Sequence, residues 1–506
     1  MNITRHLIPK SYIVAAPRNS VASLSSLAGS DQDKILGTTK ETAFFLTDSV
    51  ETLKSLADTG VQVFPNYQYE GDLFDAPVPG SIAEEGQGLP RHLDIIDIKK
   101  AWEVTRGDSS IFSAVTDSGL DLDHPQIQSS VWKNAEEVEG NGIDDDHNGK
   151  IDDVVGWDFS DDDADPAEPD GTHHTHVFGI LHAQEGESGV VGVAPQARGM
   201  SLRIGGGKRR FSSSMMVESY LYALQEGVKS INTSFNIDGF VGDRAIETTY
   251  RELADNDVLL FNSAGNSGRR NPKRSVLDDV VLVASTQTDP EHVDQRSEFS
   301  NYGWGIDISA PGSDILSTLP GGRTGALSGT SMASPVAMGV DLLLQSAHPD
   351  WNRAQRWAQI AGTADSIDAL NTDDEGQLGY GRLNAGRALT EELSPPTVTT
   401  KLNTFPNGQT MNVVIRFDKV LDPESANSGD AWRILNEKGE VVQSGPPKEV
   451  RLMTNQIDFN VARLPKGSYT LVGSAKHLKD PFGRPLDGNK DGVAGDDLVV
   501  KFQRIS

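Results

Sequence analysis

The 506-residue sequence has no cysteine, few basic residues and no long hydrophobic run. Without cysteine there can be no disulfides, thiolate metal sites or cysteine nucleophile. The 45 basic residues are outnumbered by 73 acidic ones, and the net charge of −28 disfavours binding to phosphate backbones and anionic lipid surfaces. No apolar run approaches the ~18 residues that a membrane span needs. We therefore expect neither a nucleic-acid partner nor a membrane span.

One stretch, from Leu327 to Pro335, delivers Ser331 to the start of an alanine-rich helical run. A helix N-terminus offers unpaired N–H groups and a positive partial charge, which suit an oxyanion formed beside a nucleophile. The alternative is an ordinary serine N-cap, and this stretch alone leaves both interpretations open.

Three upstream segments favour the nucleophile. Asp117 ends a short apolar strand, His173 follows an Asp-Gly-Thr sequence, and Asn266 lies between His173 and Ser331. In this order the motifs resemble those of the subtilisin-like serine proteases, or subtilases. The supporting motifs are Gly192-Val193-Ala194-Pro195, Phe299-Ser300-Asn301-Tyr302-Gly303, Ala310-Pro311-Gly312 and Gly379-Tyr380-Gly381-Arg382. Together the motifs extend over about residues 90–392 in the correct order. Several motifs in the family's order are a far more specific signal than any one of them alone.

The resemblance implies a serine endopeptidase whose partners are polypeptide substrates. Ser331 would be the nucleophile, His173 the base, Asp117 the residue that orients the base, and Asn266 a donor of the oxyanion hole. Residues that match the walls of the substrate pocket are Ser234, Phe235, Asn236, Ser263, Ala264 and Gly265. We expect a monomer with a loose preference for apolar or aromatic residues before the scissile bond.

Three residues depart from the family pattern. His174 and Phe178 stand where glycine and alanine are usual, and Asn236 replaces a glycine of the pocket wall. These changes bear on specificity and activity, so the alternative function is a weak or inactive subtilase-like binding module stabilised by calcium. A zinc site formed by His173, His174 and His176 is disfavoured, because metalloprotease helices place their ligands four residues apart around a glutamate.

Four parts are expected along the chain. Residues 1–69 read as a small α+β domain similar to the subtilase propeptide, with an unrelated accessory domain as the alternative. Residues 70–91 form a connector rich in proline and glycine, where a zymogen would be cut. Residues 92–392 alternate strands and helices, which predicts an α/β fold with a mostly parallel sheet covered on both faces. Residues 397–506 show period-two patterns that predict an immunoglobulin-like β-sandwich.

Two acidic segments predict structural Ca²⁺ sites, and no organic cofactor is expected. Oxygen-bearing side chains recur at alternate positions near a glycine, which is how a loop wraps Ca²⁺. The first set of expected ligands is Asp144, Asp146, Asn148, Asp152 and Asp153, and the second is Asp487, Asn489, Asp491 and Asp497. Val155 stands where an EF-hand has its bidentate acid, so an EF-hand is not indicated. A solvated acidic turn is the alternative.

The compartment is left open by the sequence. The domain make-up resembles that of secreted bacterial enzymes and favours a secreted or extracytoplasmic location. Residues 1–10, however, lack the apolar core and cleavage site of a secretory signal, so a cytoplasmic location is the alternative.

Overall fold

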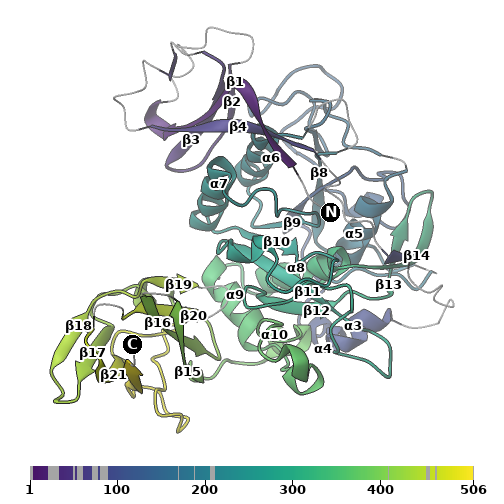
Figure 1. Ribbon diagram of the computed structural model, residues 1–506. Coiled ribbons are helices and arrows are strands. Elements are labelled where there is room, and N and C mark those ends of the chain that lie inside the picture. Colours follow the sequence, from purple (N-terminus) through teal and green to yellow (C-terminus); the bar gives the residue numbers. More distant parts are fainter. Residues whose placement is uncertain are drawn as a thin grey trace.

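A computed structural model describes most of the chain in three parts (Figure 1). The described residues are 4–20, 33–49, 52–53, 61–70, 78–79, 89–168, 170–186, 188–205, 211–407, 410–451, 456–461 and 464–504. Three segments lie mostly or wholly outside these residues: the connector, the helix that the spacing of Val50, Leu53 and Leu56 predicts, and residues 206–210.

The central part contains a seven-stranded sheet in the order β12-β11-β10-β9-β6-β8-β7, and all of its strand pairs are parallel. Its strands are β6 (Phe112–Asp117), β7 (Gly156–Asp158), β8 (Arg198–Arg203), β9 (Ser230–Thr233), β10 (Leu259–Ser263), β11 (Val280–Thr286) and β12 (Ile308–Pro311). Parallel strands are buried on both faces, which explains why β11 is a continuous run of buried residues. The predicted α/β class is confirmed.

Helices cover both faces of this sheet. They are α3 (Arg91–Ile95), α4 (Ile98–Trp102), α5 (Thr172–His182), α6 (Ser213–Gln225), α7 (Arg244–Asp255), α8 (Thr330–Ala347), α9 (Arg353–Gly362) and α10 (Ala385–Thr390). Leu259 and Phe261 join the apolar cluster under α5 and α8, whereas Leu260 joins the cluster under α6 and α7. This alternation follows from the period of two along a strand.

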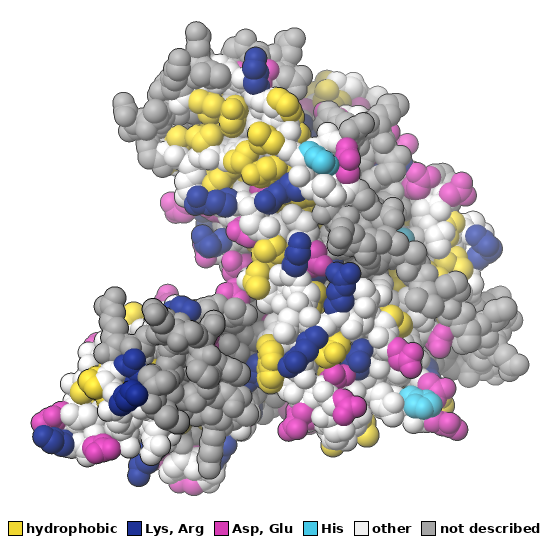
Figure 2. All heavy atoms as spheres, viewed as in Figure 1, with side chains coloured by type: hydrophobic (Ala, Val, Ile, Leu, Met, Phe, Trp, Pro, Cys, Tyr) yellow, Lys and Arg dark blue, Asp and Glu magenta, His cyan; other side chains and the backbone are white. Residues whose placement is uncertain are grey.

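The N-terminal part is an antiparallel sheet in the order β2-β3-β1-β4. Its strands are β1 (Thr4–Pro17), β2 (Lys34–Thr38), β3 (Thr42–Thr47) and β4 (Gln62–Glu70). The apolar residues at 11–15, 41–47 and 61–64 predict three strands, which agree with parts of β1, β3 and β4, whereas nothing in the sequence predicts β2. Figure 1 shows the sheet beside α6 and α7, and Figure 2 shows hydrophobic side chains gathered over this part, where Leu7, Ile35 and Val63 are exposed.

A small antiparallel sheet lies next to the start of α8. It has the order β13-β14-β5, where β13 is Ile315–Leu319, β14 is Arg323–Ser328 and β5 is the connector segment Val78–Pro79. Pro79 pairs with Leu327, and Val78 pairs with Ser328. The connector therefore reaches the strand that leads into Ser331.

The C-terminal part consists of two four-stranded antiparallel sheets and the short helix α11 (Pro423–Ala426). One sheet contains β15 (Val398–Asn407), β16 (Thr410–Phe417), β20 (Gln456–Asn460) and β19 (Glu449–Arg451); the other contains β18 (Val441–Ser444), β17 (Trp432–Asn436), β21 (Gly467–Gly473) and β22 (Leu498–Arg504). Both sheets contribute to one apolar core that includes Val413, Trp432 and Phe459. This agrees with the predicted all-β part. Among the described helices of the whole chain, none has the length and apolarity that a membrane crossing requires.

Candidate active site

Asp117 and His173 form a buried pair at the carboxyl edge of the central sheet. Asp117 is the last residue of β6, and His173 is the second residue of α5. His173 Nδ1 lies 2.9 Å from both carboxylate oxygens of Asp117. Burial alone would raise the pKa of Asp117, but the charge and hydrogen bond of His173, with smaller effects of His174 and the Ser118 N–H, hold this pKa below its ordinary value. Asp117 is therefore ionised and accepts a hydrogen bond from the imidazole N–H.

Ser331 is the second residue of α8, which packs against α5. Its hydroxyl donates to the Ser234 carbonyl oxygen at 3.1 Å, and the Ser234 hydroxyl donates to the Ser331 carbonyl oxygen at 2.9 Å. The glycine before the helix has a structural reason, because a Cβ on Gly329 would lie 3.3 Å from Asn266 Nδ2. The nucleophile candidate thus sits where a helix start, a pocket strand and Asn266 meet.

Asn266 has one end of its amide satisfied and the other free. Its Oδ1 accepts from the N–H and the hydroxyl of Thr330, both at 2.8 Å. Its buried Nδ2 has no hydrogen-bond partner among the described residues. A buried donor without a partner is costly, so Asn266 Nδ2 is a group that a ligand oxygen beside Ser331 would satisfy.

The two expected pocket walls follow neighbouring strands. Ser234 to Asn236 follow β9, Ser263 to Gly265 span the end of β10, and the strands pair in parallel. The buried guanidinium of Arg274 joins the walls, because it donates to the Ser263 carbonyl oxygen at 2.7 Å and to the Asn236 side-chain oxygen. Asp238 balances its charge at 2.9 Å. Arg274 was not found from the sequence, since it lies on a 3₁₀ turn outside any motif.

Comparison with known proteins agrees with this geometry. Residues 108–383, more than half of the chain, match the model of the Subtilase family. The chain belongs to the subtilase family. It is 31% identical to thermitase of Thermoactinomyces vulgaris over 296 residues, which is 58% of this chain and 93% of thermitase. It is also 31% identical to the thermophilic serine proteinase of Bacillus sp. strain AK1 and 29% identical to subtilisin E of Bacillus subtilis strain 168. The match to the AK1 proteinase covers 57% of this chain and 64% of that proteinase, and the match to subtilisin E covers 51% of this chain and 61% of subtilisin E. This chain therefore spans less than two thirds of the length of either relative.

The bulky residues of α5 are accommodated in this subtilase. A Cβ on Gly199 would lie 2.4 Å from the Phe178 ring, so β8 provides the space that the ring fills. The buried His174 accepts from the Gly119 N–H through Nδ1 at 3.2 Å. Burial lowers the pKa of His174 to about 4, although Asp117 opposes this shift. The neutral ring therefore braces the glycine turn that follows Asp117.

The three neighbouring histidines do not converge on one point. His173 bonds Asp117 and His174 bonds the Gly119 N–H, whereas His176 Nε2 lies 3.1 Å from the Gly325 carbonyl oxygen. Burial lowers the pKa of His176 to about 3, so this ring is neutral and donates to Gly325. With three separate partners, the rings do not form the zinc site that the sequence already disfavoured.

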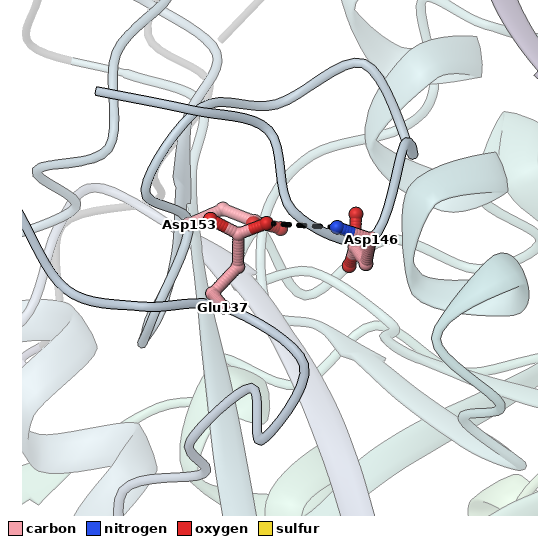
Figure 3. A group of neighbouring side chains, drawn as sticks. All are labelled: Glu137, Asp146 and Asp153. Carbon is pink, nitrogen blue, oxygen red and sulfur yellow. Dashed lines mark hydrogen bonds between the residues drawn. The ribbon is translucent and has the colours of Figure 1, made fainter. Parts of the chain in front are cut away.

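The first acidic loop brings three carboxylates together (Figure 3). Oxygens of Glu137, Asp146 and Asp153 lie within 4.8 Å of one another, and the Asp146 N–H donates to Glu137 at 3.2 Å. Burial, opposed by hydrogen bonds from Tyr222 and Asn148 and reinforced by the charges of Asp146 and Glu137, raises the pKa of Asp153. This donor set fits a hard cation such as Ca²⁺.

Other expected ligands of this loop lie differently. The Asp144 carboxylate accepts from the Gly149 N–H at 3.0 Å, and the Asp152 carboxylate accepts from the Asn141 N–H at 3.0 Å. The Asn148 side-chain oxygen accepts from the Lys150 N–H at 2.8 Å, while its Nδ2 faces carboxylates. Glu137 was missed because it precedes the Asp-Asn-Gly pattern by several residues.

The second acidic loop also forms a group of three. Oxygens of Asp487, Asp491 and Asp496 lie within 4.8 Å of one another, with Asp487 buried. Asp497, expected as a ligand, accepts instead from the Ala475 N–H at 2.8 Å. Asn489 Nδ2 donates to Asp491 at 3.1 Å, and its Oδ1 accepts from the Asp491 N–H at 2.9 Å, so it too is engaged within the loop. Adjacent aspartates cannot be told apart by spacing alone, which is why Asp496 was missed.

Proposed function

We propose that this subtilase is a serine endopeptidase in which Asp117, His173 and Ser331 form the catalytic triad. The observation that carries the proposal is the buried Asp117–His173 pair at 2.9 Å, placed with Ser331 and the free Asn266 donor at the edge of one sheet. A structural ion pair alone would not account for a buried amide donor left open beside a helix start.

Each residue has a step in the reaction. His173 takes the proton of the Ser331 hydroxyl as the oxygen attacks the peptide carbonyl, and later returns it to the leaving amine. A hydroxyl has one proton, so this transfer requires Ser331 to leave its hydrogen bond with the Ser234 carbonyl. Asp117 holds the imidazole and stabilises its cationic form. Asn266 Nδ2 and the backbone N–H of Ser331 bind the oxyanion.

Labelling by a fluorophosphonate probe, together with casein hydrolysis, tests the proposal. The native chain should be labelled at Ser331 and should hydrolyse casein, whereas Ser331→Ala should do neither. Asn266→Ala should keep the labelled serine but lower kcat by about 100- to 1,000-fold, because the oxyanion loses a donor. A folded native chain without labelling or hydrolysis would favour the alternative, a non-catalytic binding module.

We also propose that the chain is a zymogen that cuts itself between Tyr69 and Val78. Two contacts support this window: the Tyr69 N–H donates to the Phe211 carbonyl at 3.0 Å, and Val78 pairs with Ser328, three residues before Ser331. Residues 71–77 lie outside the described residues. Tethering makes the first cut intramolecular, so its rate should not depend on protein concentration.

Calcium is proposed as a structural ion of both acidic loops. Glu137, Asp146 and Asp153 would hold one ion, and the group around Asp487 the other. Burial and the nearby charges of Asp146, Asp153 and Glu136, partly offset by a hydrogen bond from Asn148, raise the pKa of Glu226 to about 7 beside the first loop. A bound cation would relieve this repulsion and lower that pKa.

A further inference from the structure

The last residues of β4 lie against the catalytic unit as an added strand. Tyr69 is only 5% exposed, and its N–H donates to the Phe211 carbonyl oxygen at 3.0 Å. The preceding residue, Gln68, forms an antiparallel bridge with Ser212. Main-chain pairing of this kind holds an extended peptide, while pockets for its side chains supply selectivity.

Aromatic rings form the walls of the pocket that receives Tyr69. The Tyr69 ring packs edge-to-face against Phe211 and Phe240, with centroid distances of 5.6 and 4.9 Å. Phe235 contacts both of these rings, at 6.2 and 6.3 Å. The walls therefore fit any planar aromatic side chain, including phenylalanine.

The floor of the pocket is polar. The Tyr69 hydroxyl donates to Asp243 Oδ2, which also accepts from the Ser213 hydroxyl at 2.5 Å. The other carboxylate oxygen of Asp243 accepts from the Ala245 N–H at 3.1 Å and caps α7. Burial and the Asp243 charge raise the pKa of Tyr69 far above its usual range, so the phenol keeps the proton that it donates. A fully buried acceptor below aromatic walls is complementary to a phenol.

The rings around the pocket lead to a segment that contacts the proposed nucleophile. Phe235, which contacts two wall rings, directly follows Ser234, and Ser234 exchanges two hydrogen bonds with Ser331. A peptide strand that leaves the pocket toward Ser331 follows the same direction as this chain, which continues from Tyr69 to Val78 beside Ser328.

We propose that the pocket formed by Phe211 and Phe240, with Phe235 packed against both rings, is a substrate subsite that selects tyrosine, and that Asp243 determines this selectivity. Once residues 1–69 have left, a tyrosine of a polypeptide substrate takes the place of Tyr69. The inference rests on the proposed endopeptidase function. A phenylalanine fills the walls but leaves Asp243 Oδ2 without its second donor, and sites built to bond a hydroxyl reject analogues that lack it.

The test uses the processed enzyme. N-terminal sequencing of the mature chain gives the number of residues between Tyr69 and the cut bond. Two peptides of otherwise identical sequence then carry tyrosine or phenylalanine at that distance before their scissile bond. We expect kcat/KM to favour the tyrosine peptide by about tenfold or more, since a hydrogen bond to a charged group is at stake.

Variants assign this preference to single groups. Asp243→Asn keeps an oxygen that can cap α7 and should reduce the ratio of the two kcat/KM values to about one to two. Among the described side chains, Ser213→Ala leaves the tyrosine as the only donor to Oδ2 and should increase the ratio. This variant keeps the test decisive if Asp243→Asn does not fold. Phe240→Leu is the matched control, because loss of a wall should weaken both peptides alike and preserve the ratio.

The outcomes separate this inference from the proposed function. Equal kcat/KM values for the two peptides, with Ser331 labelled by fluorophosphonate, overturn the subsite and leave the endopeptidase standing. A ratio unchanged by Asp243→Asn and by Ser213→Ala overturns the role of Asp243. An enzyme that cleaves peptides with residues 1–69 still attached overturns the subsite, since Tyr69 then keeps the pocket. No cleavage and no labelling overturn the proposed function and this inference with it.

Discussion

The two β parts at the ends of the chain are joined to the catalytic unit in different ways. The N-terminal sheet places Ile13, Phe44 and Phe64 in the same apolar cluster as α6 and α7. The C-terminal part has a core of its own. It contacts the catalytic unit through Arg416, which lies 3.9 Å over the Trp304 ring, and through Val420 and Phe482, which pack with the apolar cluster of that unit. One part is therefore packed as a component of the catalytic unit and the other as a separate module.

Polar contacts strengthen this contrast. Thr39 and Thr42 donate to the Glu252 carboxylate at 2.7 and 2.6 Å, and Lys34 pairs with Glu218 at 2.6 Å. These bonds tie the N-terminal sheet to α6 and α7, the helices whose starts adjoin the Tyr69 pocket. The comparison teaches that the N-terminal part shares its core and its polar contacts with the catalytic unit. We therefore expect the C-terminal part, which has a separate core, to unfold without disturbing the active site.

The largest effect is expected from acid, which should lower the stability of the catalytic unit far more than that of the C-terminal part. Burial lowers the pKa of His92, His176 and His182 to about 3 and that of His174 to about 4, and all four lie in the catalytic unit. The unfolded chain takes up these protons near pH 6.5 and the native chain does not, so the free energy of unfolding falls as the pH drops from about 6.5 toward 3. Each histidine contributes about 1.4 kcal/mol per pH unit, so all four together contribute about 5.5 kcal/mol per pH unit.

Hydrogen exchange measured by mass spectrometry at pH 7 and pH 5 reports the stability of the catalytic unit and of the C-terminal part separately. Protection should fall in α5 and the central sheet while the C-terminal sheets stay protected. His182→Gln should lessen the pH dependence, and His147→Gln, at an exposed position, is the control. An equal loss of protection in both regions would contradict the account.

The next largest effect is expected from truncating one buried phenylalanine in the N-terminal sheet and one in the C-terminal part. Phe44→Ala and Phe459→Ala should each cost about 3–5 kcal/mol, because each leaves a cavity in a packed core. Phe459→Ala should lower only the unfolding transition of the C-terminal part and leave peptide hydrolysis unchanged. Phe44→Ala should loosen the N-terminal sheet together with α6 in the unprocessed chain. Calorimetry of both variants in the Ser331→Ala background would show whether the transitions move separately.

Calcium should stabilise the catalytic unit and the C-terminal part through different loops. An ion that binds only the folded state adds about 2.7 kcal/mol when its free concentration is 100 times Kd. Asp153→Asn should remove the calcium-dependent shift of the catalytic transition, and Asp491→Asn that of the C-terminal one. Asp152→Asn, outside the group of three, is the control for the first loop. Identical melting curves with calcium and with chelator would reject both sites.

The smallest effect is expected at the junction of the two units. Arg416 lies over Trp304 and donates to the Gly376 carbonyl oxygen at 3.2 Å. Arg416→Ala should weaken docking by about 2 kcal/mol or less and leave both unfolding transitions in place. Faster proteolysis near the proline pair at residues 395–396 would report the weaker docking. Arg433→Ala is the control, because Arg433 is half-exposed. Tight docking in the variant would show that other contacts hold the module.

The central fold and its candidate triad were predictable because they rest on local patterns. β11 begins with an unbroken apolar run, Val280 to Ala284, and Asp117 and Ser331 each stand at the end or start of a regular element. β8 was missed because Arg198, Ser201 and Arg203 break its apolar pattern although most of the strand is buried. Tertiary packing supplies the burial that its own sequence does not signal.

Groups that act across long sequence distances could not be predicted. Arg274 joins two walls, and Asp243 meets Tyr69 from 174 positions away. Neither belongs to a motif, and an aspartate before a helix is equally expected as a simple N-cap. In the same way, Glu137 enters the first acidic group only because the loop folds back on itself. Such convergence is a property of the fold and leaves no local signal.

The most direct test of the account is the N-terminal sequence of the purified chain with and without its nucleophile. The native chain should be recovered as a mature form that begins between residues 70 and 78, and Ser331→Ala should remain full length and folded, since a lost hydroxyl at a helix start costs only about 1 kcal/mol. Cleavage of purified Ser331→Ala at the same bond, or a native chain that stays uncut yet hydrolyses peptides, would contradict it.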